Sequence, residues 1–199
     1  YVILATGGVG GLFASSTNFP QLTGDGVAIC LKHGIAVRDL DYVQIHPTTL
    51  YTKRRGRRFL ISESVRGEGG VLLDGTGRRF TDELKPRDVV TAAIRGQMQK
   101  EGSECVWLDM RTIPPEELRV HFPAIVKRCL EEGYDPFSRP VPVVPAQHYF
   151  MGGIGSDPEG RTEMPRLFAV GETCCNGVHG KNRLASNSLL ESLLFARRA

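Results

Sequence analysis

The chain has 199 residues, of which 41% are hydrophobic and 24% are charged, and its formal net charge is +3. This composition is typical of a folded globular protein with one or two domains and excludes a mainly disordered chain. The small net charge lacks the basic excess of proteins that neutralise many phosphates, so we expect no nucleic-acid partner.

Cysteine usage and hydropathy limit the setting of the protein. The five cysteines are an odd number without a CxxC pair, which argues against a disulfide framework and a thiolate metal site. No run reaches the roughly 18 apolar residues that span a bilayer, and the first residues do not follow the order of a signal peptide. We predict a cytoplasmic protein with no metal and no membrane partner. Because the chain begins in a strand pattern and ends in a helix pattern, we expect a fragment.

The first part of the chain alternates strand, glycine and helix patterns. Residues 1–5 are apolar and predict a buried strand, which runs into a glycine-rich turn at 6–11. Between Gly24 and Gly34, apolar positions predict a helix that begins at Asp25 and ends at the second glycine.

The middle of the chain mixes strands and helices. Residues 41–51 predict an extended segment, and 71–80 predict a hairpin around an Asp-Gly turn. An apolar face along 87–100, placed directly after Pro86, predicts a helix. A strand is expected at 105–109.

Pro114 and Pro115 introduce a second helix, which ends at Gly133 and in which Pro123 is the expected position of a bend. Residues 141–150 then predict a strand. After these elements, 167–170 predict a further strand and 187–198 a final helix. The residues expected to face inward from that helix are Leu189, Leu190, Leu193 and Leu194.

Polar and charged residues in glycine-rich surroundings recur five times. The segments are His46-Pro47-Thr48, 62–69, Pro86-Arg87-Asp88, 148–153 and 179–191. Each alone is weak evidence, because a histidine beside proline is mostly structural and Arg-Asp at a helix start is usually a cap. Their order along the chain carries the information.

That order resembles the flavoprotein family of succinate dehydrogenase, fumarate reductase and aspartate oxidase. The most specific segments are Ala5-Thr6-Gly7-Gly8, 23–26, 66–69, 170–172 and 182–190, and the resemblance covers nearly the whole chain. It implies an α/β fold in which an FAD-binding Rossmann-like domain, present in part at 1–42 and 150–199, is interrupted by an α+β capping domain at 43–149.

Two segments, 46–51 and 182–189, resemble the aspartate oxidase branch more than the respiratory enzymes. The resemblance implies FAD-dependent oxidation of L-aspartate to iminoaspartate in de novo NAD biosynthesis, with electrons passed to oxygen or fumarate. The alternative is a fumarate reductase or succinate dehydrogenase flavoprotein subunit. The implied partners are a small dicarboxylate, L-aspartate or fumarate, and quinolinate synthase. An isolated fragment is expected to be inactive.

A dicarboxylate held beside a flavin needs paired cations, and guanidinium groups bind carboxylates at two points, which makes Arg87 and Arg183 the candidates. By resemblance, Arg87 is the catalytic proton donor or acceptor. As a base it would need a dry site and a neighbouring cation such as Arg183. The resemblance completes the substrate pocket with His46, Thr48, Ser62, Glu63 and His148. Glu63 could instead face the substrate ammonium or orient an arginine.

The resemblance also assigns contacts with FAD to Gly7, Gly8, Asp25, Glu172, Asn187, Ser188 and Leu189. The free N–H groups at the start of the last helix would face the electron-rich edge of the flavin ring. The alternative is that Asn187 is an ordinary N-cap. Residues 7–11 do not satisfy G-x-G-x-x-G, so the dinucleotide fingerprint is expected upstream of this chain.

Residues 53–58 form the one dense basic run. A solvated loop is the favoured interpretation, and an anion-binding module that uses this loop is the non-enzyme alternative. We assign no role to Cys174 and Cys175, which are adjacent in the sequence.

Overall fold

The computed structural model describes residues 1–54 and 56–199, which divide into two compact units. Unit 1 contains Tyr1–Gln44 and Gln147–Ala199, and unit 2 contains Ile45–Ala146. The predicted domain limits lie within a few residues of these boundaries. The FAD-binding and capping roles of the two parts stay predictions.

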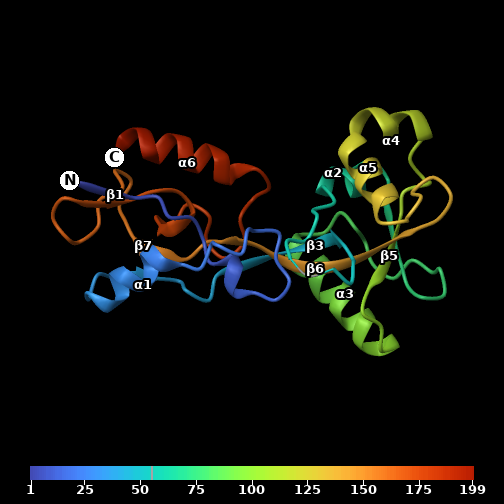
Figure 1. Cartoon of the computed structure of the whole chain (residues 1–199), viewed down its shortest axis with the longest axis horizontal. Helices are drawn as coiled ribbons and strands as arrows, with labels where there is room; N and C mark the ends of the chain where they lie inside the picture. Colours follow the sequence, from blue (N-terminus) through green and yellow to red (C-terminus); the bar gives the residue numbers. More distant parts are fainter. Residues whose placement is uncertain (55) are drawn as a thin grey trace. The chain divides into compact units, whose positions relative to one another are not determined.

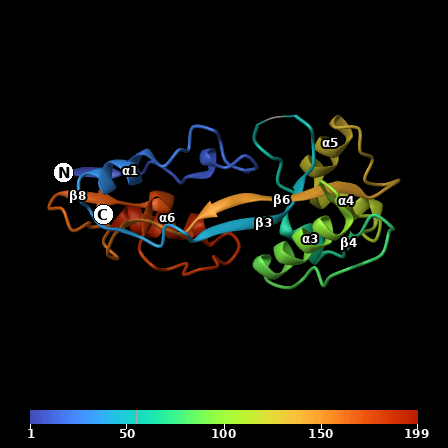
Figure 2. The ribbon, with the colours of Figure 1, turned by 90° about the horizontal axis from the view of Figure 1, so that it is seen from below.

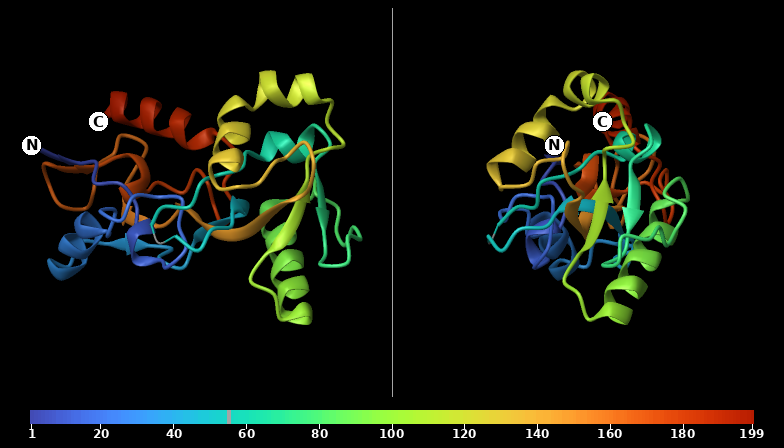
Figure 3. Two further views of the ribbon diagram at one scale, coloured as in Figure 1. Left: turned by 45° about the vertical axis from the view of Figure 1, so that its right-hand side comes forward. Right: turned by 90° about the vertical axis from the view of Figure 1, so that its right-hand side faces the viewer.

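Unit 1 consists of two small sheets with a helix on either side (Figure 1, Figure 3). Strand β1 (Val2–Leu4) pairs in parallel with β8 (Leu167–Ala169). In the second sheet, β7 (Gly153–Gly155) lies between β2 (Val37–Arg38), which is antiparallel, and β9 (Cys174–Cys175), which is parallel. The helices are α1 (Asp25–Lys32) and α6 (Asn187–Arg198), and the 3-10 turns are η1 (Gly10–Leu12) and η2 (Gly171–Thr173).

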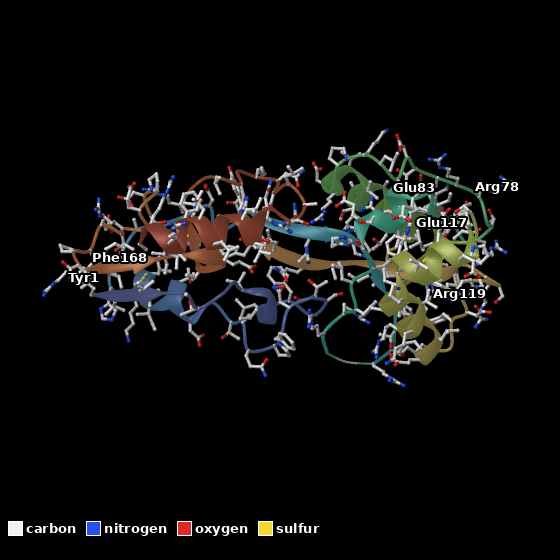
Figure 4. All side chains as sticks on the ribbon, turned by 90° about the horizontal axis from the view of Figure 1, so that it is seen from above. Tyr1, Arg78, Glu83, Glu117, Arg119 and Phe168 are labelled. Atoms are coloured by element: carbon white, nitrogen blue, oxygen red, sulfur yellow. The ribbon has the colours of Figure 1, made fainter. Side chains whose placement is uncertain are left out.

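The core of unit 1 lies between α1 and the second sheet. It includes Val27 and Cys30 from α1, Phe150, and Ile154 from β7. Both chain ends lie at the β1–β8 end of this unit (Figure 2). There the rings of Tyr1 and Phe168 lie 6.1 Å apart (Figure 4).

Two burial predictions for unit 1 are wrong. The first strand forms, but Tyr1 is 93% exposed and Val2 57%, because β8 is its only strand neighbour in the described chain, residues 1–54 and 56–199. The predicted inward leucines of α6 are exposed by 49–66%, namely Leu189, Leu190, Leu193 and Leu194. The buried residue of this helix is Glu191. A polar network, described below, therefore occupies the inner face of α6.

Unit 2 is built on a four-stranded sheet in the order β3-β6-β5-β4. The strands are β3 (Val43–Leu50), β6 (Val141–Phe150), β5 (Val106–Asp109) and β4 (Val71–Leu73), with β4 and β6 antiparallel to β5. Helix α3 (Arg87–Glu101) lies on one side of this sheet, and α4 (Pro115–His121) with α5 (Pro123–Glu131) lies on the other (Figure 1, Figure 3). Leu72, Ile94, Leu108 and Cys129 are fully buried between these layers.

The predicted bent helix after Pro114 is two helices. Phe122 adopts φ −128° and ψ 46°, outside the helical region, and Pro123 is the first residue of α5. Because proline has no N–H, it cannot continue the hydrogen-bond ladder of α4 but is well tolerated at a helix start. The other predicted helices appear as α1, α3 and α6, and the strand over 141–150 appears as β6.

The hairpin predicted over 71–80 turns at Asp74, whose Oδ1 accepts the N–H groups of Thr76 and Arg78 at 2.8 and 2.9 Å. Gly77 provides the positive φ of 81°. Within residues 1–54 and 56–199, we find no helix with the length and apolar character needed to cross a membrane.

Candidate functional site

The first residues of α2 (Glu63–Gly67) and α3 form an ion pair in unit 2. Arg87 donates from Nε at 2.8 Å and from Nη2 at 2.7 Å, both to Oε2 of Glu63. The other oxygen, Oε1, lies 3.9 Å from Nη2 of Arg66, one turn further along α2. One carboxylate therefore joins two guanidinium groups.

Arg66 was not among the predicted site residues, although its spacing of three residues from Glu63 on a helix was a usable signal. Its side chain is 1% exposed, and Nη1 donates to the carbonyl of Glu83. Burial lowers the pKa of Arg66, and the charge of Arg87 lowers it further, whereas Glu63 raises it. Two arginines that share one carboxylate keep a net positive charge, which favours an anionic ligand.

Short polar contacts attach the predicted residues of β3 to the segment before α2. The hydroxyl of Thr48 donates to the carbonyl of Ile61 at 3.2 Å, and the N–H of Ile61 donates back to the Thr48 carbonyl at 3.1 Å. His46, 1% exposed, places Nδ1 3.2 Å from the N–H of Thr48. Ser62 Oγ accepts the N–H of Ser64 at 3.2 Å and so caps α2. Unit 2 thus gathers these side chains around the start of α2.

The other predicted arginine lies in unit 1. Arg183 is 4% exposed, and its Cζ lies 4.4 Å from the centre of the Tyr149 ring. Gln44, itself buried, donates from Nε2 to the carbonyl of Arg183 at 2.7 Å and to Oδ1 of Asn182 at 3.0 Å. A ring face and a fixed backbone therefore hold this cation in place.

His148, the remaining predicted substrate residue, is half-buried in unit 1. Its Nδ1 lies 2.8 Å from the hydroxyl of Thr17, which is 5% exposed. The hydroxyl also lies 3.3 Å from the carbonyl of Gln147, to which it donates. This contact fixes the orientation of the imidazole ring.

Four of the predicted cofactor residues gather near the glycine-rich turn of unit 1. A Cβ at Gly8 would lie 2.4 Å from Oε1 of Glu172, so only glycine permits this approach. That oxygen accepts the N–H of Phe150 at 2.9 Å. Burial raises the pKa of Glu172 to about 7, against the opposing effect of the Phe150 N–H. Gly7 precedes with φ +75°, and Asp25 begins α1 beside the turn.

The start of α6 has no side-chain cap. Ser186 is the N-cap, with φ 64°, and Asn187 is the first helical residue, so the Asn187 N-cap alternative is wrong. Asn187 and Ser188 are half-buried, whereas Leu189 is 66% exposed. A helix N-terminus with uncapped N–H groups has the donor chemistry that an electron-rich ring edge requires, so these residues fit a flavin.

The predicted basic run at 53–58 falls partly outside the described residues, since Arg55 is not described. Arg54 lies 3.5 Å from Glu132, and Arg58 donates to the carbonyl of Thr52 at 2.5 Å. No group of three or more His, Cys, Asp or Glu side chains that could hold a metal ion occurs in residues 1–54 and 56–199.

Comparisons with known proteins place these features in a family. The family described as FAD binding domain matches residues 1–189. The L-aspartate oxidase of Clostridium perfringens is 56% identical over 198 residues, which are 99% of this chain and 45% of that enzyme. The L-aspartate oxidase of Clostridium acetobutylicum is 54% identical over 198 residues, again 99% of this chain and 46% of that enzyme. The chain thus spans less than half the length of these curated relatives.

Solved structures of related flavoproteins are also similar to this chain. A mutant of E. coli quinol fumarate reductase FrdA has a TM-score of 0.89 and 37% identity, over 100% of this chain and 37% of that one. Mycobacterium smegmatis Sdh1 has a TM-score of 0.81 and 39% identity, over 100% of this chain and 35% of that one. The predicted α/β fold class and the predicted cofactor, FAD, are confirmed. The chain belongs to the FAD binding domain family, among the L-aspartate oxidases and the fumarate reductase and succinate dehydrogenase flavoproteins that its ordered motifs resemble.

Proposed function

We propose that the chain is part of an FAD-dependent L-aspartate oxidase, an enzyme that converts L-aspartate to iminoaspartate and passes electrons to oxygen or fumarate. The observation that carries the proposal is the cluster in which Arg87 and Arg66 share the carboxylate of Glu63. Two buried guanidinium groups on one carboxylate carry a net positive charge, which is suited to a dianionic substrate. The identity of 56% with a curated L-aspartate oxidase supports the choice of substrate.

FAD, when bound, supplies the hydride acceptor for the Cα hydrogen of the substrate. The residues of the chain supply orientation and proton transfer. Arg87 and Arg183 are proposed as cationic anchors for carboxylate, and each is at least nine-tenths buried. His46, Ser62 and His148 are proposed as hydrogen-bond partners of the substrate.

Arg87 is the proposed proton-transfer group. A proton that leaves its Nε or Nη2 is passed to Oε2 of Glu63, since both nitrogens already donate to that oxygen. Arg66 faces Oε1 of the same carboxylate, and its positive charge favours the ionised form of Glu63, so that the proton returns from Oε2 to Arg87. The neighbouring cation that a basic arginine needs is therefore Arg66 in this proposal.

The alternative function is that of a fumarate reductase or succinate dehydrogenase flavoprotein subunit, supported by the 37–39% identity with FrdA and Sdh1. The same cationic cluster suits succinate and fumarate. L-Aspartate differs from succinate only by its amino group, so an assay with these two substrates decides between the functions.

The finer features of the setting belong to the same proposal. We propose a cytoplasmic enzyme, which agrees with free thiols at all five cysteines. Quinolinate synthase is the proposed partner that consumes the unstable imine product. The 199-residue chain by itself is expected to bind FAD weakly or not at all and to be inactive, and a yellow protein with one flavin per chain would contradict this.

The proposal is tested by replacing the matching 198 residues of the Clostridium perfringens enzyme with this chain, to give a protein called the chimera below. We expect the chimera to form iminoaspartate and hydrogen peroxide from L-aspartate. Turnover of succinate with L-aspartate inert would favour the alternative. A chimera that turns over neither contradicts both functions.

Arg87→Leu in the chimera is expected to lower kcat by about 10²- to 10⁴-fold while FAD stays bound. Arg95→Leu is the matched control, because Arg95 is an exposed arginine on the same helix, α3. Unchanged turnover after Arg87→Leu removes this residue from the mechanism.

A further inference from the structure

The guanidinium group of Arg183 packs against the ring of Tyr149, and buried polar groups fix the position of this ring. The ring of Tyr149, at the end of β6, is 4.4 Å from the guanidinium carbon and is 7% exposed. Its hydroxyl donates to Oε2 of Glu191 at 3.3 Å. The ring edge also meets His179, with ring centres 5.5 Å apart and planes at 88°. Three separate elements of unit 1 therefore fix this ring.

Glu191 anchors the assembly from the inner face of α6. Its side chain is 4% exposed, and Oε1 accepts Nδ2 of Asn176 at 2.9 Å. Nε2 of His179 lies 3.7 Å from Oε2. A buried carboxylate is costly unless donors surround it, and here the amide of Asn176 and the phenol of Tyr149 donate hydrogen bonds to it. This network is the reason why α6 turns a glutamate inward and its leucines outward.

Filling space in the core does not by itself require a tyrosine at position 149. A leucine is also apolar, but it has no negative ring face to bind the guanidinium group of Arg183. The backbone of Arg183 is held separately, by the hydrogen bond from Gln44 to its carbonyl. The tyrosine therefore positions the guanidinium group of Arg183, whereas Gln44 positions its backbone.

We propose that Tyr149 is a positioning residue that holds the Arg183 guanidinium ready for a substrate carboxylate and thereby sets the preference for dicarboxylates. The inference rests on the proposed function, in which Arg183 is one carboxylate anchor. A guanidinium group fixed before the ligand binds loses less conformational freedom on binding, so the ring face contributes to affinity without touching substrate.

The test uses Tyr149→Leu and Tyr149→Phe in the chimera, with FAD absorbance as the check that the cofactor site is intact. Tyr149→Leu is expected to raise KM for L-aspartate by about 5- to 30-fold, the range of a desolvated cation–π contact, with a smaller change in kcat. Tyr149→Phe keeps the ring face and is expected to restore KM to within about 3-fold of the unsubstituted chimera. The affinity for malonate, a dicarboxylate, should fall by the same factor as KM rises. The affinity for acetate, a monocarboxylate that needs only one cationic anchor, should change little.

Two further variants separate positioning from general damage. In an Arg183→Leu background, Tyr149→Leu should have no further effect on KM, because contacting residues are coupled. Tyr42→Leu is the matched control, since Tyr42 also faces a cation in unit 1, with Lys181 Nζ 5.6 Å from its ring centre, and has no proposed role.

Equal losses of malonate and acetate affinity, or additive effects of the Tyr149 and Arg183 substitutions, would overturn the positioning role. A chimera that binds malonate but does not oxidise L-aspartate contradicts only the proposed function, and the malonate series then still tests Tyr149. A chimera that binds no malonate overturns both.

Discussion

Arg87 places two N–H donors, Nε and Nη2, on a single oxygen of Glu63, at 2.8 and 2.7 Å. This leaves the second oxygen of Glu63 to Arg66, 3.9 Å away. Since α2 begins with Glu63 and α3 begins with Arg87, the pair also joins the first turns of two helices of unit 2. The contact is therefore both a structural connection and the proposed path of a proton.

Glu63→Gln in the chimera should separate these two roles. Glutamine keeps an oxygen that can accept from Arg87 but does not accept a proton near neutral pH. We expect kcat to fall by about 10²- to 10⁴-fold, with little change in KM or FAD content. Steady-state turnover of L-aspartate measures this, with Glu117→Gln on the exposed face of α4 as control (Figure 4). A rise in KM of the same size, with kcat unchanged, would mean that Glu63 binds substrate but takes no part in proton transfer.

Substitutions at Ser62 should distinguish its capping role from its proposed contact with substrate. Ser62→Ala removes the oxygen that accepts the Ser64 N–H, so we expect a loss of about 0.5–2 kcal/mol in the free energy of unfolding and a higher KM. Ser62→Thr retains the hydroxyl and should restore both quantities. Urea titration and steady-state kinetics measure them. Ser103→Ala is the control, because it also removes a serine hydroxyl with a local backbone contact, a hydrogen bond donated to the Cys105 carbonyl at 3.0 Å. A threonine variant as weak as the alanine variant would contradict this account.

Gly8→Ala should disturb the position of Glu172. The added methyl group would lie 2.4 Å from Oε1 and 2.7 Å from Cδ of this carboxylate, so the side chain must move. We expect a loss of about 1–3 kcal/mol in unfolding free energy, the usual range for overpacking. Gly96→Ala, on α3 with no atom within 4 Å of its added methyl group, should instead raise stability by up to about 1 kcal/mol. Thermal unfolding of the two variants should therefore shift in opposite directions.

The stability of the chain should decrease as pH rises toward 7, because of Glu172. Its pKa is about 7 in the folded chain, raised by burial, and about 4.3 in an unfolded chain. Between these values the folded state holds the extra proton, so its advantage is complete below about pH 4 and is lost as pH passes through 7. The difference corresponds to about 3–4 kcal/mol of unfolding free energy.

Glu172→Gln provides the check on this pH dependence. Glutamine stays neutral at all pH values and keeps an oxygen for the Phe150 N–H, so the decrease in stability between pH 4.5 and 7.5 should largely disappear. Urea titrations at several pH values measure it, with Glu159→Gln at an exposed position as control. A variant that loses stability with pH as steeply as the unsubstituted chain would show that another group is responsible.

The sequence by itself determined the elements with strong local signals. Helix α3 follows from its apolar period and from Pro86, and β6 follows from a mainly apolar ten-residue run, since these signals act between residues close in the chain. The ordered motifs also determined the family and the cofactor. They also drew attention to Glu63 and to the two arginines, Arg87 and Arg183, whose guanidinium groups are suited to binding carboxylates at two points.

Tertiary structure decided which groups meet. Arg66 joins Arg87 through Glu63 only because α2 and α3 begin side by side. The ring of Tyr149 contacts Arg183 only because the fold brings the end of β6 to a segment more than thirty residues later in the chain. The inner face of α6 was predicted as leucine but is Glu191, since local periodicity gives an amphipathic stripe and not the direction of the core. The partners that satisfy Glu191 lie up to 42 residues away in the sequence, and no local pattern specifies a contact at that separation.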